Sequence, residues 1–216
     1  MNVNIYVADS SHIEYAGAIC KLMYISALER GTGIAERSPD YIAGKMAGGK
    51  AVIALDGERL AGFAYIETWS HHRFVANSGL IVAHEYREQG LAKRIKKKVF
   101  DLSRKLYPDS KIFSITTGLA VMKLNTQLGF KPVTFSELTD DPEFWKGCLG
   151  CRNYDVLVRN DFRMCLCTGL LYDPKATPKP QQKLLTAGKA FISPVMRLNS
   201  KFTVKNKKQS PCLKIG

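Results

Sequence analysis

The 216-residue sequence predicts an α/β domain with a mixed, mostly antiparallel sheet flanked by helices. Two observations lead to this class. Short apolar runs alternate with segments of helical periodicity along most of the chain. In addition, the stretch from Gly79 to Leu106 joins an apolar strand to an amphipathic helix through a polar turn that ends in glycine.

This turn is suited to binding an anion. Apolar residues recur at helical spacing from Leu91 onward, so the helix begins directly after Gly90. The first amides of a helix have no partner within it and carry partial positive charge, which favours phosphate. We expect the basic side chains of the helix to lie on its exposed faces and to bind a further phosphate. They are Lys93, Arg94, Lys96, Lys97 and Lys98.

The hexapeptide from Arg87 to Ala92 reads R-E-Q-G-L-A, which is neither the Rossmann glycine pattern nor a P-loop. It resembles the [RQ]-x-x-G-x-[GA] motif of the GNAT acetyltransferase superfamily, and a Gly129-Phe130 pair follows a later helix as in that superfamily. The resemblance covers about residues 1–174. It implies the GNAT fold, acyl-CoA-dependent acyl transfer and acetyl-CoA as co-substrate. The cofactor contacts that it implies are Leu80, Ile81, Val82, Arg87, Glu88, Gln89, Gly90, Leu91, Ala92 and Lys93.

The other elements follow from caps, turns and periodicity. Ser38-Pro39-Asp40 predicts the start of a helix, and Gly57-Glu58-Arg59 predicts a hairpin. An insertion at about 136–163 precedes the last strand, and we expect it to shape the acceptor site. The expected helices cover 10–29, 39–47, 91–106 and 120–128, and the expected strands cover 4–8, 51–56, 60–69, 74–83, 111–117, 131–135 and 164–172.

The net charge of +13 is distributed unevenly. Residues 175–216 contain ten lysines and arginines and no acid, which leaves +3 for the rest of the chain. We therefore expect an acetyltransferase domain over 1–174 and a basic, flexible tail over 175–216. The apolar runs are too short to span a membrane, and the N-terminus does not resemble a signal peptide, so we expect a cytoplasmic protein without a membrane partner.

Acyl transfer to an amine needs a base, a site for the oxyanion and a proton for the leaving thiolate. Glu67, near the end of a strand, is the candidate base; its alternative role is that of a solvated surface residue, and His71 and His72 are weaker candidates. The family's tyrosine, four residues before Gly129, is replaced here by Asn125. An amide can hydrogen-bond the thiolate but is no acid, so the sequence leaves the proton donor open.

The expected acceptor is a small amine. Arg30 and Arg37 are candidates to bind a carboxylate, and Glu36 with Asn77 or Ser78 to bind the amine. Such an acceptor is an amino acid, and the chain faintly resembles bacterial proteins that acylate glutamate in arginine biosynthesis. The alternatives are solvated arginines, a protein N-terminus as acceptor, or a nucleic-acid or ribosome-associated module that uses the basic tail. A homodimer is one assembly that we consider.

Four cysteines form two closely spaced pairs, Cys148-x2-Cys151 and Cys165-x-Cys167. In a reducing compartment such pairs are more typical of metal ligands than of disulfides. They predict a structural zinc with four thiolate ligands. The alternative is that the cysteines are small apolar residues of the last strand and of a turn.

Overall fold

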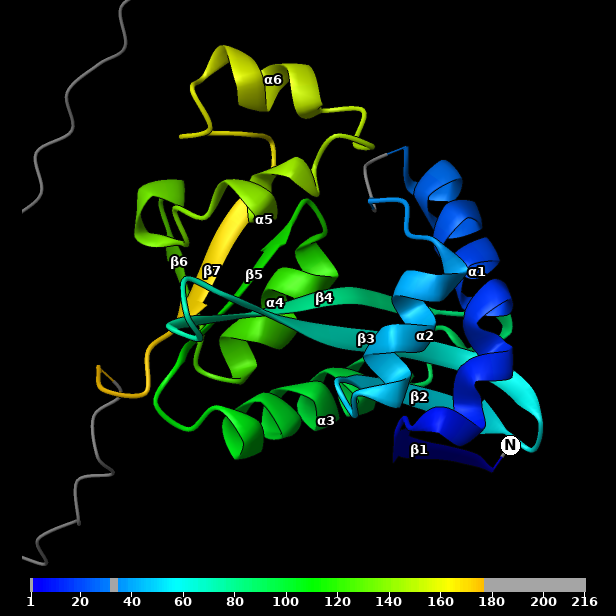
Figure 1. The fold of residues 1–216 in the computed structure, drawn as a ribbon. Coiled ribbons are helices and arrows are strands. Elements are labelled where there is room, and N and C mark those ends of the chain that lie inside the picture. The colour runs from blue at the N-terminus through cyan, green and yellow to red at the C-terminus, as the bar shows by residue number, and fades with distance from the viewer. Residues whose placement is uncertain (1, 32–34, 177–216) are drawn as a thin grey trace, which may run out of the picture. The chain divides into compact units, whose positions relative to one another are not determined.

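A computed structural model describes residues 2–31 and 35–176. Its seven strands form one sheet in the order β1-β2-β3-β4-β5-β7-β6 (Figure 1). Only β4 and β5 pair in parallel within the described part of the sheet, which confirms the predicted mixed, mostly antiparallel class. The strands are β1 Val3–Val7, β2 Ala51–Asp56, β3 Arg59–Trp69, β4 Phe74–Val82, β5 Lys111–Thr116, β6 Lys131–Val133 and β7 Thr168–Tyr172.

Helices α2, α3 and α4 begin and end close to the predicted positions, whereas the helix predicted over 10–29 is a 3-10 helix over Ser10–Tyr15 followed by α1, and the two short helices of the insertion were not predicted. Ser38 caps α2 by accepting a hydrogen bond from the amide of Tyr41. Two strands are shorter than predicted: β7 begins at Thr168, and β6 ends before Thr134, where a capping box with Glu137 starts a short 3-10 turn. The helices are α1 Ala16–Arg30, α2 Pro39–Ala47, α3 Leu91–Leu106, α4 Leu119–Gln127, α5 Pro142–Lys146 and α6 Tyr154–Arg159.

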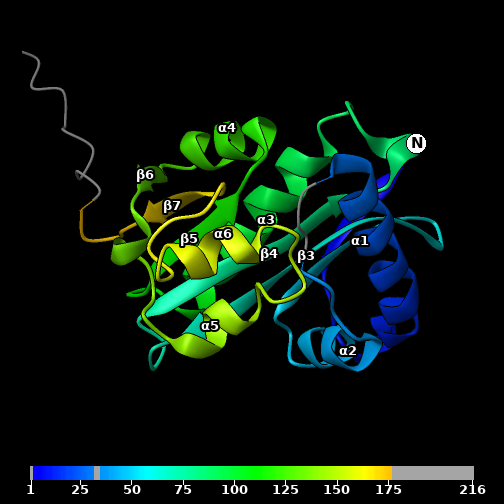
Figure 2. The same cartoon turned by 90° about the horizontal axis from the view of Figure 1, so that it is seen from above.

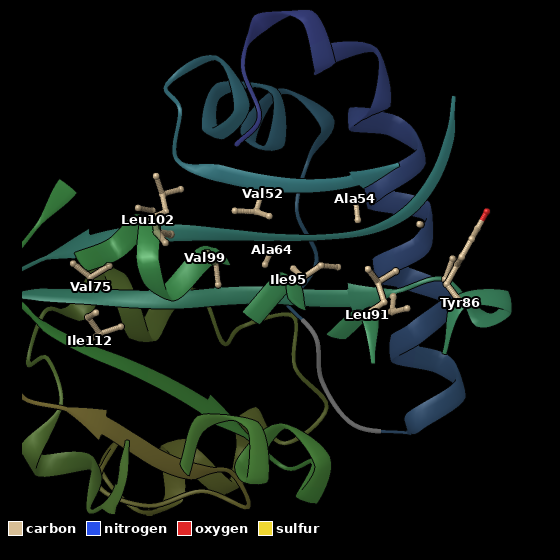
Figure 3. Packing of buried hydrophobic residues seen from close by; sticks show 14 of the residues in the cluster. Val52, Ala54, Ala64, Val75, Tyr86, Leu91, Ile95, Val99, Leu102 and Ile112 are labelled. Carbon is tan, nitrogen blue, oxygen red and sulfur yellow. The ribbon is translucent and has the colours of Figure 1, made fainter. Parts of the chain in front are cut away.

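The two faces of the sheet are covered by different helices, because successive strand residues point to opposite sides. One face packs against α3, where Ile95, Val99 and Leu102 meet Val52 and Val75 (Figure 3). The other face carries α1 and α2 over β2 and β3. On this second face the insertion covers β4 and β5 through α5 (Figures 1 and 2). Each fully buried large side chain in these layers contributes roughly 1.5–3 kcal/mol of transfer free energy.

Strands β4 and β5 separate along their length. They pair only from Phe74 with Lys111 to Ala76 with Phe113, and beyond these residues the sheet is open between them. A bulge lies on the same part of β4, because Gly79 and Leu80 together stand opposite Ala64 of β3. Gly79 is left-handed at φ 63°, and a Cβ there would lie 2.4 Å from Cε1 of Tyr65. The opening and the bulge together locate the candidate site.

Among the helices of residues 2–31 and 35–176, none is both long and apolar enough to cross a membrane. The proposed tail lies almost wholly outside the described residues, which end at Ala176. Its boundary and flexibility therefore stay predictions.

Candidate active site

A cavity of about 860 Å³ lies where β4 and β5 separate. This volume is in the range of sites for small molecules and cofactors. Glu67 and Tyr65 reach the cavity from the face covered by α1 and α2, whereas Lys96 reaches it from α3 on the opposite face. The cavity therefore passes through the sheet. The insertion closes one side of it with Phe144, Lys146 and Cys148, among others.

Glu67 is a buried carboxylate at this cavity, 6% exposed. The hydroxyl of Tyr41 donates a hydrogen bond to its Oε1, and the hydroxyl of Ser78 donates to its Oε2 at 3.0 Å. The solvated alternative for Glu67 is thus wrong. His71 and His72 are exposed in the turn between β3 and β4 and are not among the residues that line the cavity.

Arg37 lies beside this carboxylate network. Its Nε donates to the hydroxyl of Tyr65 at 3.1 Å, and its guanidinium packs 5.3 Å from the centre of the Tyr41 ring. Burial alone would lower the pKa of Arg37, but Tyr65, Glu67 and Tyr41 outweigh it and raise this pKa. Burial, followed by the charge of Glu67, raises the pKa of both tyrosines. The guanidinium is therefore cationic and the two hydroxyls are protonated at neutral pH.

The predicted acceptor residues divide between the two faces. Glu36, Arg37, Asn77 and Ser78 all line the cavity, and the side chain of Arg30 lies outside the described part of the structure. Asn77 differs from Ser78, because its amide nitrogen donates to Ser103 at 2.8 Å and its carbonyl oxygen accepts from Lys96. The predicted role of Asn77 in holding an acceptor amine conflicts with these contacts, since alternation along β4 turns its side chain toward α3.

The predicted exposure of Lys96 is wrong. It was expected on the exposed surface of α3, but only 2% of the residue is exposed and its Nζ lies 3.3 Å from Oδ1 of Asn77. Nζ also lies 5.2 Å from the centre of the Phe130 ring. Burial lowers the pKa of Lys96 to about 7. By contrast Lys93, Arg94, Lys97 and Lys98 are exposed, as predicted.

The turn before α3 has the predicted form. Gly90 is left-handed at φ 75°, and nothing lies within 4 Å of the position that its Cβ would take. No side chain caps the helix, so the first amides of α3 stay available to a phosphate. Arg87 stabilises the turn through two contacts. Its Nε donates to the Val82 carbonyl at 3.2 Å, and its Nη2 forms an ion pair with Oε2 of Glu29 at 2.7 Å. Gln89 donates to the carbonyl of Glu85.

The other residues predicted to contact the cofactor differ in whether they line the cavity. Leu80 lines the cavity, whereas the side chains of Ile81, Val82 and Leu91 are buried in the apolar layers. Glu88 adopts a positive φ of 62° in the turn. Contacts of these residues with acetyl-CoA stay predictions.

Asn125 lies fully buried on α4 and is not among the residues that line the cavity. Both polar atoms of its side chain lack a hydrogen-bond partner among the described residues. The predicted hydrogen bond from Asn125 to a leaving thiolate therefore gains no support from its position.

The four cysteines give no support to the zinc prediction. In the described ranges, no group of three or more histidine, cysteine, aspartate or glutamate residues is arranged to hold a metal ion. Burial, followed by the charges of neighbouring thiols, raises the pKa of Cys148 to about 11 and that of Cys167 to about 12. Cys148, Cys165 and Cys167 instead pack against the apolar cluster under the insertion, and Cys151 lies in the turn after α5.

Sequence reasoning missed three residues of the site. Tyr41 contacts Glu67, 26 residues away in the sequence, and Tyr65 contacts Arg37, 28 residues away. A local sequence pattern does not predict contacts over such separations. The sequence does contain a signal that Lys96 is buried. On a helix it shares a stripe with Ala92, Val99 and Ser103, whose small or apolar side chains are typical of a packed face.

The open parallel pair, the bulge on β4 and the uncapped start of α3 all lie within residues 28–130. This segment matches the model of the GNAT acetyltransferase family and is an acetyltransferase domain. A search of curated protein sequences gave no match.

Solved structures show the same fold. A GNAT acetyltransferase from Staphylococcus aureus Mu50 superposes with a TM-score of 0.58 at 14% identity, covering 80% of this chain and 99% of that chain. The protein yncA from Salmonella typhimurium, solved with acetyl-CoA, gives 0.56 at 14% identity over 84% and 99%. N-acetylglutamate synthase from Neisseria gonorrhoeae, solved with coenzyme A and N-acetyl-glutamate, gives 0.56 at 18% identity. That match covers 80% of this chain but only 35% of the synthase.

Proposed function

We propose that this acetyltransferase transfers the acetyl group of acetyl-CoA directly to the primary amine of a small carboxylate-bearing molecule, with amino acids such as glutamate as the leading candidates. The observation that carries this proposal is that a buried carboxylate, Glu67, and a half-buried guanidinium, Arg37, line one cavity. An amine and a carboxylate on one molecule complement these two groups.

The co-substrate fits the end of the cavity near α3. The free amides after Gly90 and the open space above this glycine suit the pyrophosphate of acetyl-CoA. The pantetheine arm then has room between β4 and β5, since these strands do not pair beyond Ala76 and Phe113. The bulge at Gly79 and Leu80 interrupts the regular pairing of β4 with β3 beside this path. Backbone amides freed there are our candidates to stabilise the oxyanion.

Glu67 is the proposed base. Two hydroxyl donors, Tyr41 and Ser78, hold its carboxylate at the cavity. A carboxylate fixed in this way accepts a proton from the acceptor ammonium, and the neutral amine then attacks the thioester carbon. No covalent intermediate with the enzyme is required.

Arg37 is the proposed carboxylate ligand. Its Nη1 donates to the Glu36 carbonyl at 3.0 Å and its Nε to Tyr65, so the guanidinium is held in one orientation. The insertion lies close to it, because a Cβ on Gly147 would be 3.2 Å from Nη2 of Arg37. This proximity supports the proposal that the insertion limits the size of the acceptor.

An acceptor screen tests the proposal. Purified protein is incubated with acetyl-CoA and single amino acids, their decarboxylated amines or short peptides, and released coenzyme A is measured. We expect turnover with amino acids, glutamate first, and little with the amine that lacks the carboxylate. Turnover confined to peptide N-termini would favour a protein acetyltransferase instead. Binding of RNA that disappears on truncation at Pro174 would favour the nucleic-acid module.

A further inference from the structure

Lys96 is an ionisable group that the mechanism above does not use. It projects from α3 to the cavity beneath the opening between β4 and β5. A buried ammonium is costly unless it is paired, and neutral lysines of this kind recur at functional sites. Among the described residues, no carboxylate forms an ion pair with it. Its position therefore calls for an explanation beyond packing.

Among the residues that the structure describes, Nζ of Lys96 has one hydrogen-bond partner. Asn77 on β4 accepts a hydrogen bond from Nζ, and Ser103 on α3 accepts one from the Asn77 amide and so holds Asn77 in place. The ring of Phe130, which precedes β6, lies 5.2 Å from Nζ. Burial is the one cause that lowers the pKa of Lys96, and no neighbouring charge shifts it. A protonated Lys96 has three N–H groups, so at least one proton remains for a bound molecule.

The path of acetyl-CoA brings its sulfur toward this amine. The pyrophosphate site at Gly90 lies on α3, and Lys96 follows it by six residues, about 9 Å along the helix axis. The acceptor groups Glu67 and Arg37 lie on the opposite face of the sheet. The carbonyl carbon must face them, so the sulfur comes to lie on the α3 side of the opening. Asn125, which replaces the family's tyrosine, does not line the cavity.

We propose that Lys96 donates the proton that the thiolate of coenzyme A takes up as it leaves. This inference rests on the proposed function. As the C–S bond of the tetrahedral intermediate breaks, its electron pair goes to sulfur; an N–H bond of the Lys96 ammonium breaks and an S–H bond forms. The acceptor ammonium gives up two protons in becoming an amide. One is released through Glu67, and the other returns to Lys96 through solvent. A donor with a pKa near the working pH is the efficient one for such a transfer.

Titration of the thiol of bound coenzyme A tests this without a known acceptor. The ultraviolet absorbance of the thiolate is followed against pH for wild type, Lys96→Met and Lys105→Met, the last being an exposed lysine near the other end of the same helix. The Lys96 amine and the thiol of bound coenzyme A would titrate as a coupled pair, in which the ammonium and the thiolate stabilise each other. We therefore expect the thiolate absorbance to appear at lower pH in wild type than in Lys96→Met. Lys105→Met should match wild type.

The outcomes separate the two proposals. Equal thiol pKa values in wild type and Lys96→Met, with coenzyme A bound to both, would overturn the role of Lys96 and leave the proposed function intact. Failure of wild type to bind coenzyme A would overturn both. With an acceptor in hand, Lys96→Met should lower kcat by about 10²-fold or more and leave the KM for acetyl-CoA unchanged. Its kcat should also lack the decline that wild type shows as pH rises above about 7.

Discussion

Glu67 and Lys96 lie on opposite faces of one sheet and line the same cavity. They share it because β4 and β5 stop pairing after Ala76 and Phe113. A carboxylate thus lines the cavity from one side and an amine from the other. In the proposed mechanism, the two proton transfers of amide formation fall to these separate residues.

The base assignment predicts the behaviour of Glu67→Gln. The amide keeps the shape of the side chain but does not take a proton from the acceptor, so we expect kcat to fall by about 10²–10³-fold. Calorimetric affinity for acetyl-CoA should stay within about twofold of wild type. Exposed Glu58→Gln in the β2–β3 hairpin is the control and should leave both quantities unchanged. Wild-type turnover in Glu67→Gln across the pH range would remove Glu67 from the mechanism.

Arg37→Lys tests the acceptor site. Lysine keeps the positive charge but loses the fork that binds a carboxylate through two parallel hydrogen bonds. We expect the KM for a carboxylate-bearing acceptor to rise about tenfold or more, with little change in the affinity for acetyl-CoA. Steady-state kinetics with the best acceptor measures this. An unchanged acceptor KM would show that the carboxylate, if the acceptor has one, binds elsewhere.

Buried Lys96 predicts a pH dependence of stability. Its pKa is about 7 in the folded protein, against 10.5 for an ordinary lysine, so the unfolded chain binds more protons between these pH values. The free energy of unfolding contributed by this group therefore rises with pH from about 7 to 10.5. Lys96→Met should lack that rise and should be more stable at pH 7 by about 1–3 kcal/mol, part of the gain being offset by the unpaired Asn77. Urea unfolding at several pH values checks this, and a less stable Lys96→Met would contradict it.

The cysteines give a prediction about metal. Because no three such ligands are arranged around one point in the described ranges, and Cys148 and Cys167 pack under the insertion, we expect purified protein to contain no stoichiometric zinc. Treatment with a chelator should leave the melting temperature unchanged. One zinc per chain by elemental analysis, together with a lower melting temperature after chelation, would restore the original zinc hypothesis.

Local signals in the sequence were enough to predict most of the fold. Gly90 and the apolar spacing after it located α3, and Ser38-Pro39-Asp40 located α2. The last strand was predicted too long, because apolar Met164 and Leu166 resemble strand residues although both are exposed. Periodicity does not report on such tertiary context.

The candidate site was predicted less completely than the fold. Glu67 was proposed because it lies near the end of an apolar strand, whereas its partner Tyr41 comes from a helix whose position depends on packing. Lys96 was assigned to the surface because it belongs to a lysine-rich run. Charged side chains are normally exposed, and only the three-dimensional structure shows which lysine of such a run is buried.

Calorimetric titration of acetyl-CoA into wild type, Gly90→Glu and Gly49→Glu tests the central claim most directly. Gly49 is also left-handed, with open space around it, at the opposite end of α2 from the cavity-lining Ser38, so it controls for backbone strain and added charge. We predict binding to wild type and Gly49→Glu and none to Gly90→Glu, whose carboxylate fills and repels the pyrophosphate site. Equal binding to all three proteins, or none to wild type, would contradict the account.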